Sequence, residues 1–170
     1  IPDGFIYVPE GRFQFGIPDD ELVRRFFTTT PQHEVRTEAF LIARHETTYA
    51  QWLEFLRTLA PDQRAKFLPG NDSMLIGAGI NLSTSADGVW RLSISSGERT
   101  YTAPEGEPIV YVGRRERVSQ DWLQMPATGL NVADSTAYVA WLASSGKVPG
   151  ARLCTDWEWE RAIRGADGRR

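Results

Sequence analysis

Residues 152–165 read Arg152-Leu153-Cys154-Thr155-Asp156-Trp157-Glu158-Trp159-Glu160-Arg161-Ala162-Ile163-Arg164-Gly165, and we call this stretch the signature segment. Thr155 and Glu158 have the spacing of a capping box, in which two side chains satisfy backbone N–H groups at a helix start. Gly165 is a typical residue for ending a helix. The signature segment therefore predicts a helix that begins after Thr155 and stops at Gly165.

The charged residues of the signature segment favour a structural role. Glu158 and Glu160 are two positions apart, so they point to different helix faces and cannot easily share one substrate as an acid–base pair. Arg161 follows Glu158 by three positions and Arg164 follows Glu160 by four, which is the spacing of helical ion pairs. We expect Arg152 to anchor the same corner.

Two more helices are expected upstream. Thr48 and Gln51 form another capping box, with Pro61 ending that helix, and Asn131 is a good N-cap for the other. Each predicted helix carries an apolar stripe that we expect to be buried. The stripes are Tyr49, Trp52, Leu53, Leu56 and Leu59; Ala133, Ala137, Tyr138, Trp141 and Leu142; and Trp159, Ala162 and Ile163.

The remaining order is expected in short strands. They are residues 5–8, 12–15, 33–42, 89–95, about 100–102, and 109–112. A tight turn is expected at Pro9-Glu10-Gly11, and Ser96-Gly97 favours a hairpin. Residues 19–30 are expected to form a surface loop, as are 77–79, where Gly77-Ala78-Gly79 lacks the rest of a phosphate-binding motif.

Composition limits the classes of protein to which the chain can belong. The 170 residues are 41% hydrophobic and 24% charged, which predicts one globular domain. A net charge of −3 provides no basic excess for nucleic acid, and no apolar run approaches the length of a membrane span. A single cysteine excludes an internal disulfide framework and a multi-cysteine zinc site.

A few residues invite a chemical interpretation. Cys154 precedes a helix N-cap, where its thiol could be reactive, but a catalytic role is the weaker reading. His33 and His45 would need further ligands to hold a metal, with Glu46 the only carboxylate directly beside them. We interpret both histidines as parts of an ordinary strand and its exit.

Two surface candidates for ligand binding remain. Arg114, Arg115 and Arg117 form a local basic cluster that could receive an anionic ligand or the acidic loop of a partner, although such runs are commonly solvated faces. Trp122 is the tryptophan that we expect to be exposed, and it could stack on a sugar.

Four stretches in order carry a family resemblance. They are Gly11–Gly16, His33–Thr48, Met125–Leu142 and the signature segment. Together they resemble the formylglycine-generating enzyme, or sulfatase-modifying factor, family, whose corresponding segment reads Arg-Leu-Pro-Thr-Glu-x-Glu-Trp-Glu-x-Ala-x-Arg-Gly. The family-signature residues, which we expect to be structural, are Arg152, Leu153, Thr155, Glu158, Trp159, Glu160, Arg161, Arg164 and Gly165, of which Arg161 stands at a position that the motif leaves open. Cys154 stands where the family has proline.

The resemblance implies an α+β fold of the C-type-lectin-like kind, irregular, with short strands and about three helices. It also implies that residues 1–170 are the N-terminal half of one domain, truncated before its C-terminal half. In the family, that later half carries the redox cysteines, which bind copper, and the calcium ligands. No catalytic, cofactor-binding or metal-binding residue is therefore carried onto this chain, and copper or calcium would depend on the later half.

The sequences of Leu41–Trp52 and Gln120–Trp122 most resemble those of family members that are fused to bacterial serine/threonine protein kinases. We therefore expect a non-catalytic module that binds a small-molecule or protein ligand, without nucleic acid and without a membrane span in these residues. The alternative is the N-terminal half of a copper- and oxygen-dependent oxidase that makes formylglycine from a sulfatase cysteine. Neither reading fixes whether the domain is cytoplasmic or extracytoplasmic.

Overall fold

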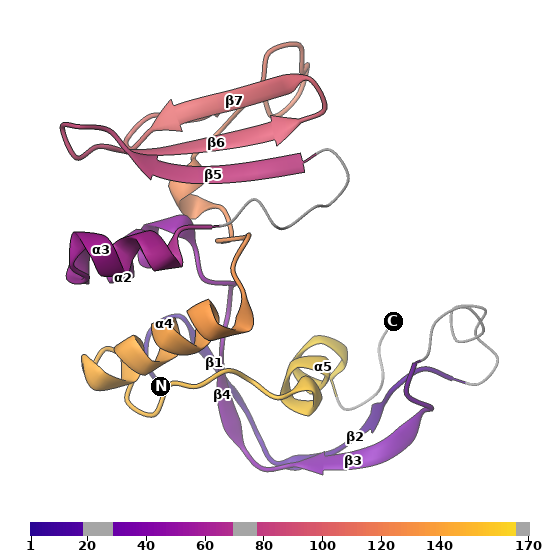
Figure 1. The fold of residues 1–170 in the computed structure, drawn as a ribbon. Coiled ribbons are helices and arrows are strands. Elements are labelled where there is room, and N and C mark those ends of the chain that lie inside the picture. Colours follow the sequence, from indigo (N-terminus) through magenta and orange to yellow (C-terminus); the bar gives the residue numbers. More distant parts are fainter. Residues whose placement is uncertain (19–28, 70–77, 166–170) are drawn as a thin grey trace. The chain divides into compact units, whose positions relative to one another are not determined.

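The structure is a computed structural model, and it describes residues 1–18, 29–69 and 78–165. Those residues form a mixed α+β fold of short antiparallel strands and four α-helices (Figure 1). The chain divides into two compact units, residues 1–45 with 152–170 and residues 46–151. The expected surface loop at 19–30 lies mostly outside the described residues.

The first unit consists of two ribbons and a helix. β1 (Phe5–Val8) pairs with β4 (Phe40–Ala43), and β2 (Gly11–Phe15) pairs with β3 (His33–Thr37), both antiparallel. α5 (Asp156–Arg164) lies against β2 and β3. Segments from the two ends of the chain thus build one unit.

Two strand predictions in this unit need correction. The single strand expected over residues 33–42 is divided at Glu38 and Ala39 into β3 and β4, which pair with different partners. The tight turn expected at Pro9-Glu10-Gly11 is a bend at Glu10, and Gly11 already belongs to β2, which is not paired with β1. Sequence pattern identifies β-prone segments but not their partners.

The second unit contains helices and a three-stranded sheet. Its elements are α2 (Tyr49–Thr58), α3 (Pro61–Arg64), η1 (Ala65–Phe67), β5 (Ala78–Thr84), β6 (Trp90–Ser96), β7 (Arg99–Pro104), β8 (Ile109–Val110), β9 (Ser119–Gln120), η2 (Trp122–Gln124) and α4 (Val132–Ser144). The sheet order is β5-β6-β7, all antiparallel, and β8 pairs with β9.

The core of the second unit joins α2 to the sheet. Trp52, Leu53 and Leu56 on α2 are fully buried, as are Leu82 on β5 and Leu92 on β6. Aromatic rings extend this core. They include Tyr49, Phe55, Trp90, Tyr111, Trp122 and Tyr138, several of them in edge-to-face contact. The apolar stripe predicted for α2 is therefore confirmed.

The helix starts of the second unit are also confirmed. Thr48 caps α2 in a capping box with Gln51, and Asn131 caps α4 in a box with Asp134. Pro61 lies beyond the end of α2 and begins α3, because proline is well suited to the first helical turn. On α4, Tyr138 of the predicted apolar stripe is buried.

Three details of the second unit were predicted wrongly. Ala133 is exposed, because the first turn of α4 buries the capping carboxylate of Asp134 instead. The loop expected at 77–79 is strand from Ala78 onward, since β5 pairs along the whole of β6, and Gly77 lies outside the described residues. The strand expected at 109–112 ends at Val110. The predicted hairpin at Ser96-Gly97 is present as β6 and β7.

Within the described part of the chain, no helix has both the length and the apolar character needed to span a membrane.

Candidate functional site

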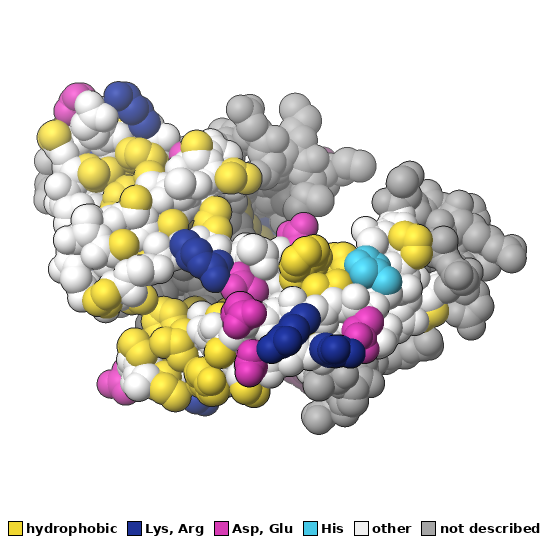
Figure 2. Space-filling view, turned by 90° about the horizontal axis from the view of Figure 1, so that it is seen from below, with side chains coloured by type: hydrophobic (Ala, Val, Ile, Leu, Met, Phe, Trp, Pro, Cys, Tyr) yellow, Lys and Arg dark blue, Asp and Glu magenta, His cyan; other side chains and the backbone are white. Residues whose placement is uncertain are grey.

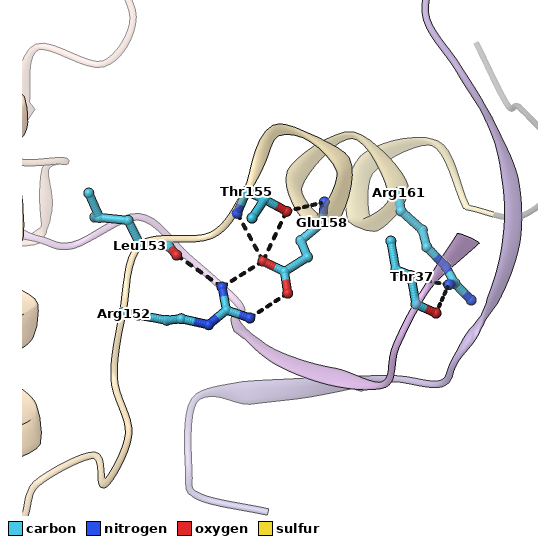
Figure 3. A network of polar contacts seen from close by, with 6 residues as sticks. All are labelled: Thr37, Arg152, Leu153, Thr155, Glu158 and Arg161. Carbon is cyan, nitrogen blue, oxygen red and sulfur yellow. Dashed lines mark hydrogen bonds and ion pairs between the residues drawn. The ribbon is translucent and has the colours of Figure 1, made fainter. Parts of the chain in front are cut away.

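The start of α5 is held by a carboxylate with several donors. Thr155 is the N-cap: its hydroxyl accepts from the backbone N–H of Glu158 at 3.2 Å, and its own N–H donates to Glu158 Oε2 at 2.8 Å. Arg152 completes the arrangement, donating to the two carboxylate oxygens of Glu158 at 2.7 and 2.5 Å (Figure 3). The predicted capping box and the anchoring role of Arg152 are confirmed.

This arrangement sets the ionisation of Glu158. The hydrogen bonds from Arg152 lower the pKa of Glu158 to about 2, and the bonds from Thr155 act in the same direction, while burial opposes them. The same pair raises the pKa of Arg152. Glu158 is thus a permanently ionised structural anion at neutral pH, because a general acid would need a pKa nearer to 7.

The guanidinium of Arg161 joins α5 to the ends of three strands. Its Nη1 donates to the carbonyl oxygen of Gly11 at 2.7 Å and to the hydroxyl of Thr37, and its Nη2 donates to the carbonyl oxygen of Pro9 at 2.6 Å. Arg161 is only 6% exposed. The five donors of an arginine suit this task, since they satisfy carbonyls that the paired strands leave unpaired.

On the same helix, Glu160 and Arg164 form hydrogen bonds with the backbone N–H and carbonyl groups of a single glycine. Gly16 donates its N–H to Glu160 Oε1 at 2.8 Å and accepts from Arg164 Nη1 at 2.7 Å. The predicted ion pair between Glu160 and Arg164 is present at 3.1 Å. A Cβ at Gly16 would lie 2.6 Å from the carbonyl oxygens of Thr30 and Pro31, so glycine is required there.

We call these residues the signature corner: Arg152, Thr155, Glu158, Glu160, Arg161 and Arg164 with their partners Pro9, Gly11, Gly16 and Thr37. The expected pair between Glu158 and Arg161 is wrong, because among the described residues Arg161 bonds to β2 and β3 and to Pro9. The partners on the β2 side were missed. Gly11 and Gly16 belong to one of the four stretches that resemble the family, and that resemblance is the sequence signal that could have identified these partners.

The predicted buried stripe of α5 is also wrong. Trp159 is 56% exposed, Ile163 is 62% exposed, and Ala162 is exposed as well. The helix instead turns Glu158 and Arg161 inward, because the strand ends beside it present carbonyls rather than an apolar surface. Leu153 and the free thiol of Cys154 are exposed just before the helix.

Among the described residues, neither histidine side chain forms a hydrogen bond with a residue of the signature corner. The Nδ1 of His33 is 2.8 Å from the carbonyl oxygen of Pro31, and its ring packs edge-on against Phe15. His45 is exposed in the same unit. Within residues 1–18, 29–69 and 78–165, no three His, Cys, Asp or Glu side chains come together as a metal site would require.

The two surface candidates have opposite outcomes. Trp122 is fully buried, because its Nε1 donates to the carbonyl oxygen of Pro104 at 3.1 Å and its ring packs edge-on against Tyr49. Its expected exposure is therefore wrong. Arg114, Arg115 and Arg117 are exposed in the loop between β8 and β9, with the guanidinium of Arg114 stacked 4.0 Å above the ring of Tyr111.

Charge elsewhere is mixed rather than segregated. Across β2 and β3, Arg12 pairs with Glu34 at 3.1 Å, and Arg36 pairs with Glu10 at 2.8 Å. Figure 2 shows basic and acidic side chains interspersed on the face that it presents. Such exposed pairs are typical of solvated surface and contribute little to stability.

Comparison with known proteins places this arrangement in a family. A model of the sulfatase-modifying factor enzyme 1-like domain matches residues 2–170, which include every residue of the signature corner. No curated protein matches the chain. The sequence contains one cysteine, the exposed Cys154, so these residues cannot supply a pair of thiols to a copper ion. The chain belongs to the sulfatase-modifying factor enzyme 1-like domain family.

Proposed function

We propose that the chain is a non-catalytic binding module of a larger bacterial signalling protein, such as a serine/threonine kinase. The supporting observation is that charged side chains of the signature corner bond to other residues of that corner. Arg152, Glu158 and Arg161 each bond within the signature corner, so these ionised groups help to maintain the fold, and Glu158 and Arg161 are buried rather than presented to a substrate.

Surface features agree with a binding role. The loop between β8 and β9 exposes three arginines, and valines are exposed in and beside it, whereas Glu158 and Arg161 of the signature segment are buried. The kinase association is supported by the resemblance of Leu41–Trp52 and Gln120–Trp122 alone, and it is therefore part of the proposal to be tested.

A second candidate function is favoured by membership of the family itself. The parent protein would be an oxidase that uses dioxygen and two electrons from a thiol reductant to convert a substrate cysteine to formylglycine, with release of hydrogen sulfide and water. Its metal-binding thiols would come from residues beyond this sequence, and this chain would contribute the scaffold of the signature corner.

One experiment separates the two functions. The full parent protein is incubated with copper, dioxygen, a thiol reductant and a sulfatase-type peptide containing one cysteine, and the peptide is followed by mass spectrometry. A synthetic formylglycine peptide, added to a parallel sample, controls for detection. We expect the peptide to keep its thiol, and conversion to the aldehyde would overturn the proposal.

The same protein provides the test of the module's role. Phosphotransfer, or the activity of whichever output domain the parent carries, is measured with residues 1–170 present and deleted. We expect the deletion to change the output. An unchanged output, or a parent without an output domain, would contradict a signalling module.

A further inference from the structure

Residues 110–118, which are the last residue of β8 and the loop that leads from it to β9, form the most distinctive exposed feature of the second unit, and we call them the arginine loop. Its base is anchored: Ile109 is fully buried, Tyr111 is 6% exposed, and the N–H of Tyr111 donates to the carbonyl oxygen of Val118 at 2.7 Å. The ring of Tyr111 also packs edge-on against Tyr101 at 5.1 Å. The loop thus rises from a fixed base.

The tip of the arginine loop is held by contacts of its own. Arg114 donates its N–H to the carbonyl oxygen of Tyr111 at 3.3 Å, and Arg99 on β7 donates to the carbonyl oxygen of Val112 at 3.2 Å. Arg117 has φ 49°, the one positive φ of a non-glycine residue in the described part of the chain. Backbone in this region is unfavourable for arginine, and such residues cluster at functional sites.

Apolar side chains are exposed along this loop. Val112 is 74% exposed, and Val110 and Val118 are also largely in solvent. A folded chain normally buries valine, and these three lie within nine residues of each other on a backbone held by hydrogen bonds. Exposed apolar side chains surrounded by polar residues are a feature of interaction surfaces.

The charge of the arginine loop specifies the partner. Arg114, Arg115 and Arg117 outnumber the single Glu116, and among the described residues none of the three forms an ion pair. Stacking on Tyr111 leaves the edge of the Arg114 guanidinium available for a carboxylate. The surface therefore complements a ligand that is both anionic and apolar.

The rest of the chain favours a short ligand. Net charge is −3, so the basic loop is a local feature of an acidic protein. A long polyanion, such as nucleic acid or an anionic membrane, would extend beyond the loop and meet repulsion from the remaining surface. An acidic peptide segment contacts only the loop.

We infer that the arginine loop binds an extended acidic segment of a partner protein, with its carboxylates on Arg114, Arg115 and Arg117 and its apolar side chains on Val110, Val112 and Val118. This inference rests on the proposed binding role, and it names the surface and the chemistry of the partner.

The test uses the full chain and a fluorescently labelled peptide of alternating glutamate and leucine, followed by anisotropy at low and moderate salt. Peptides of alternating lysine and leucine, or glutamate and serine, are the charge and apolar controls. We expect the glutamate–leucine peptide to bind more tightly than either control, and its binding to weaken as salt rises.

Two variants locate the site. Arg115→Glu should weaken binding of the peptide about tenfold, because it reverses one contacting charge. Arg91→Glu, on the exposed side of β6, makes the same change in net charge away from the loop and should leave binding unchanged. Circular dichroism checks that both variants fold.

Three results would overturn the inference: no preference for the glutamate–leucine peptide, equal weakening by the two variants, or loop-dependent binding only to phosphatidylserine vesicles or an oligonucleotide. Each of these leaves the proposed function standing if deletion of residues 1–170 still alters the output of the parent. Conversion of the cysteine peptide to an aldehyde would instead reject the proposed function, whatever the loop binds.

Discussion

Arg161 and Gly11 are 150 positions apart in the sequence, yet Nη1 of Arg161 donates to the carbonyl oxygen of Gly11 over 2.7 Å. The same guanidinium reaches Pro9 and Thr37, so one side chain connects α5 to β2, β3 and the bend before β2. The family-motif residues of the signature corner hold this corner together with Arg161, which stands at a position that the motif leaves open. Their side chains supply the hydrogen-bond donors and acceptors that the backbone groups of this corner require.

Gly16 should not tolerate a side chain. It has φ 92°, and a Cβ would lie 2.6 Å from the backbone oxygens of Thr30 and Pro31. We expect Gly16→Ala to lower the free energy of unfolding by roughly 2 kcal/mol or more, measured by urea denaturation. Gly4→Ala is the matched control, since Gly4 has a similar φ of 80° but open space around it. Equal losses in both variants would show that crowding at Gly16 is unimportant.

Glu158 should make the stability depend on acid. Its pKa is about 2 in the folded chain and near 4.3 when unfolded, so the folded state favours the ionised form. That stability is fully present above about pH 4.3 and is lost as pH falls toward 2. Allowing for solvent around the half-exposed Arg152, we expect about 2 kcal/mol.

The measurement is the urea unfolding free energy of wild type and Glu158→Gln between pH 7 and pH 3. The variant should be less stable at pH 7, and the difference should shrink as the pH falls. Glu34→Gln, which removes an exposed ion pair with Arg12, is the control and should change stability little. A difference between wild type and Glu158→Gln that is constant with pH would contradict the assignment.

Two tryptophans that were predicted in the wrong environments provide a third test. Trp122→Phe removes one of the two donors to the carbonyl oxygen of Pro104, the other being the N–H of Glu107, and opens space in the core, so we expect a loss of about 2 kcal/mol. Trp159→Phe changes a half-exposed side chain and should stay within about 0.5 kcal/mol. Thermal unfolding compares the two variants directly. A larger loss of stability for Trp159→Phe than for Trp122→Phe would instead support the sequence-based prediction that Trp159 is buried and Trp122 exposed.

The local signals of the sequence predicted much of the fold. Capping residues such as Thr48, Asn131 and Thr155 located the starts of α2, α4 and α5, because a cap satisfies backbone groups within its own turn. The hairpin of β6 and β7 followed from alternation and a turn at Gly97. These features depend only on residues close to one another in the chain.

The errors arose where distant groups decide the outcome. Periodicity put Trp159 and Ile163 inside α5, but the neighbours of that helix offer carbonyl oxygens, and arginine satisfies them better than an apolar side chain does. Trp122 was placed outside because its acceptor, the carbonyl of Pro104, cannot be recognised from sequence. The pairing of β1 with β4 and of β2 with β3 is likewise decided by partners far along the chain.

The most direct test of the central claim, that the signature residues maintain the fold, is the unfolding free energy of Arg161→Ala against Arg12→Ala. Arg161 supplies charged hydrogen bonds to the hydroxyl of the buried Thr37 and to two partly buried carbonyl oxygens, so its removal should cost about 3 kcal/mol or more. Arg12 forms an exposed ion pair, so Arg12→Ala should cost no more than about 1 kcal/mol. The account predicts that large difference, and equal, small losses in both variants would contradict it.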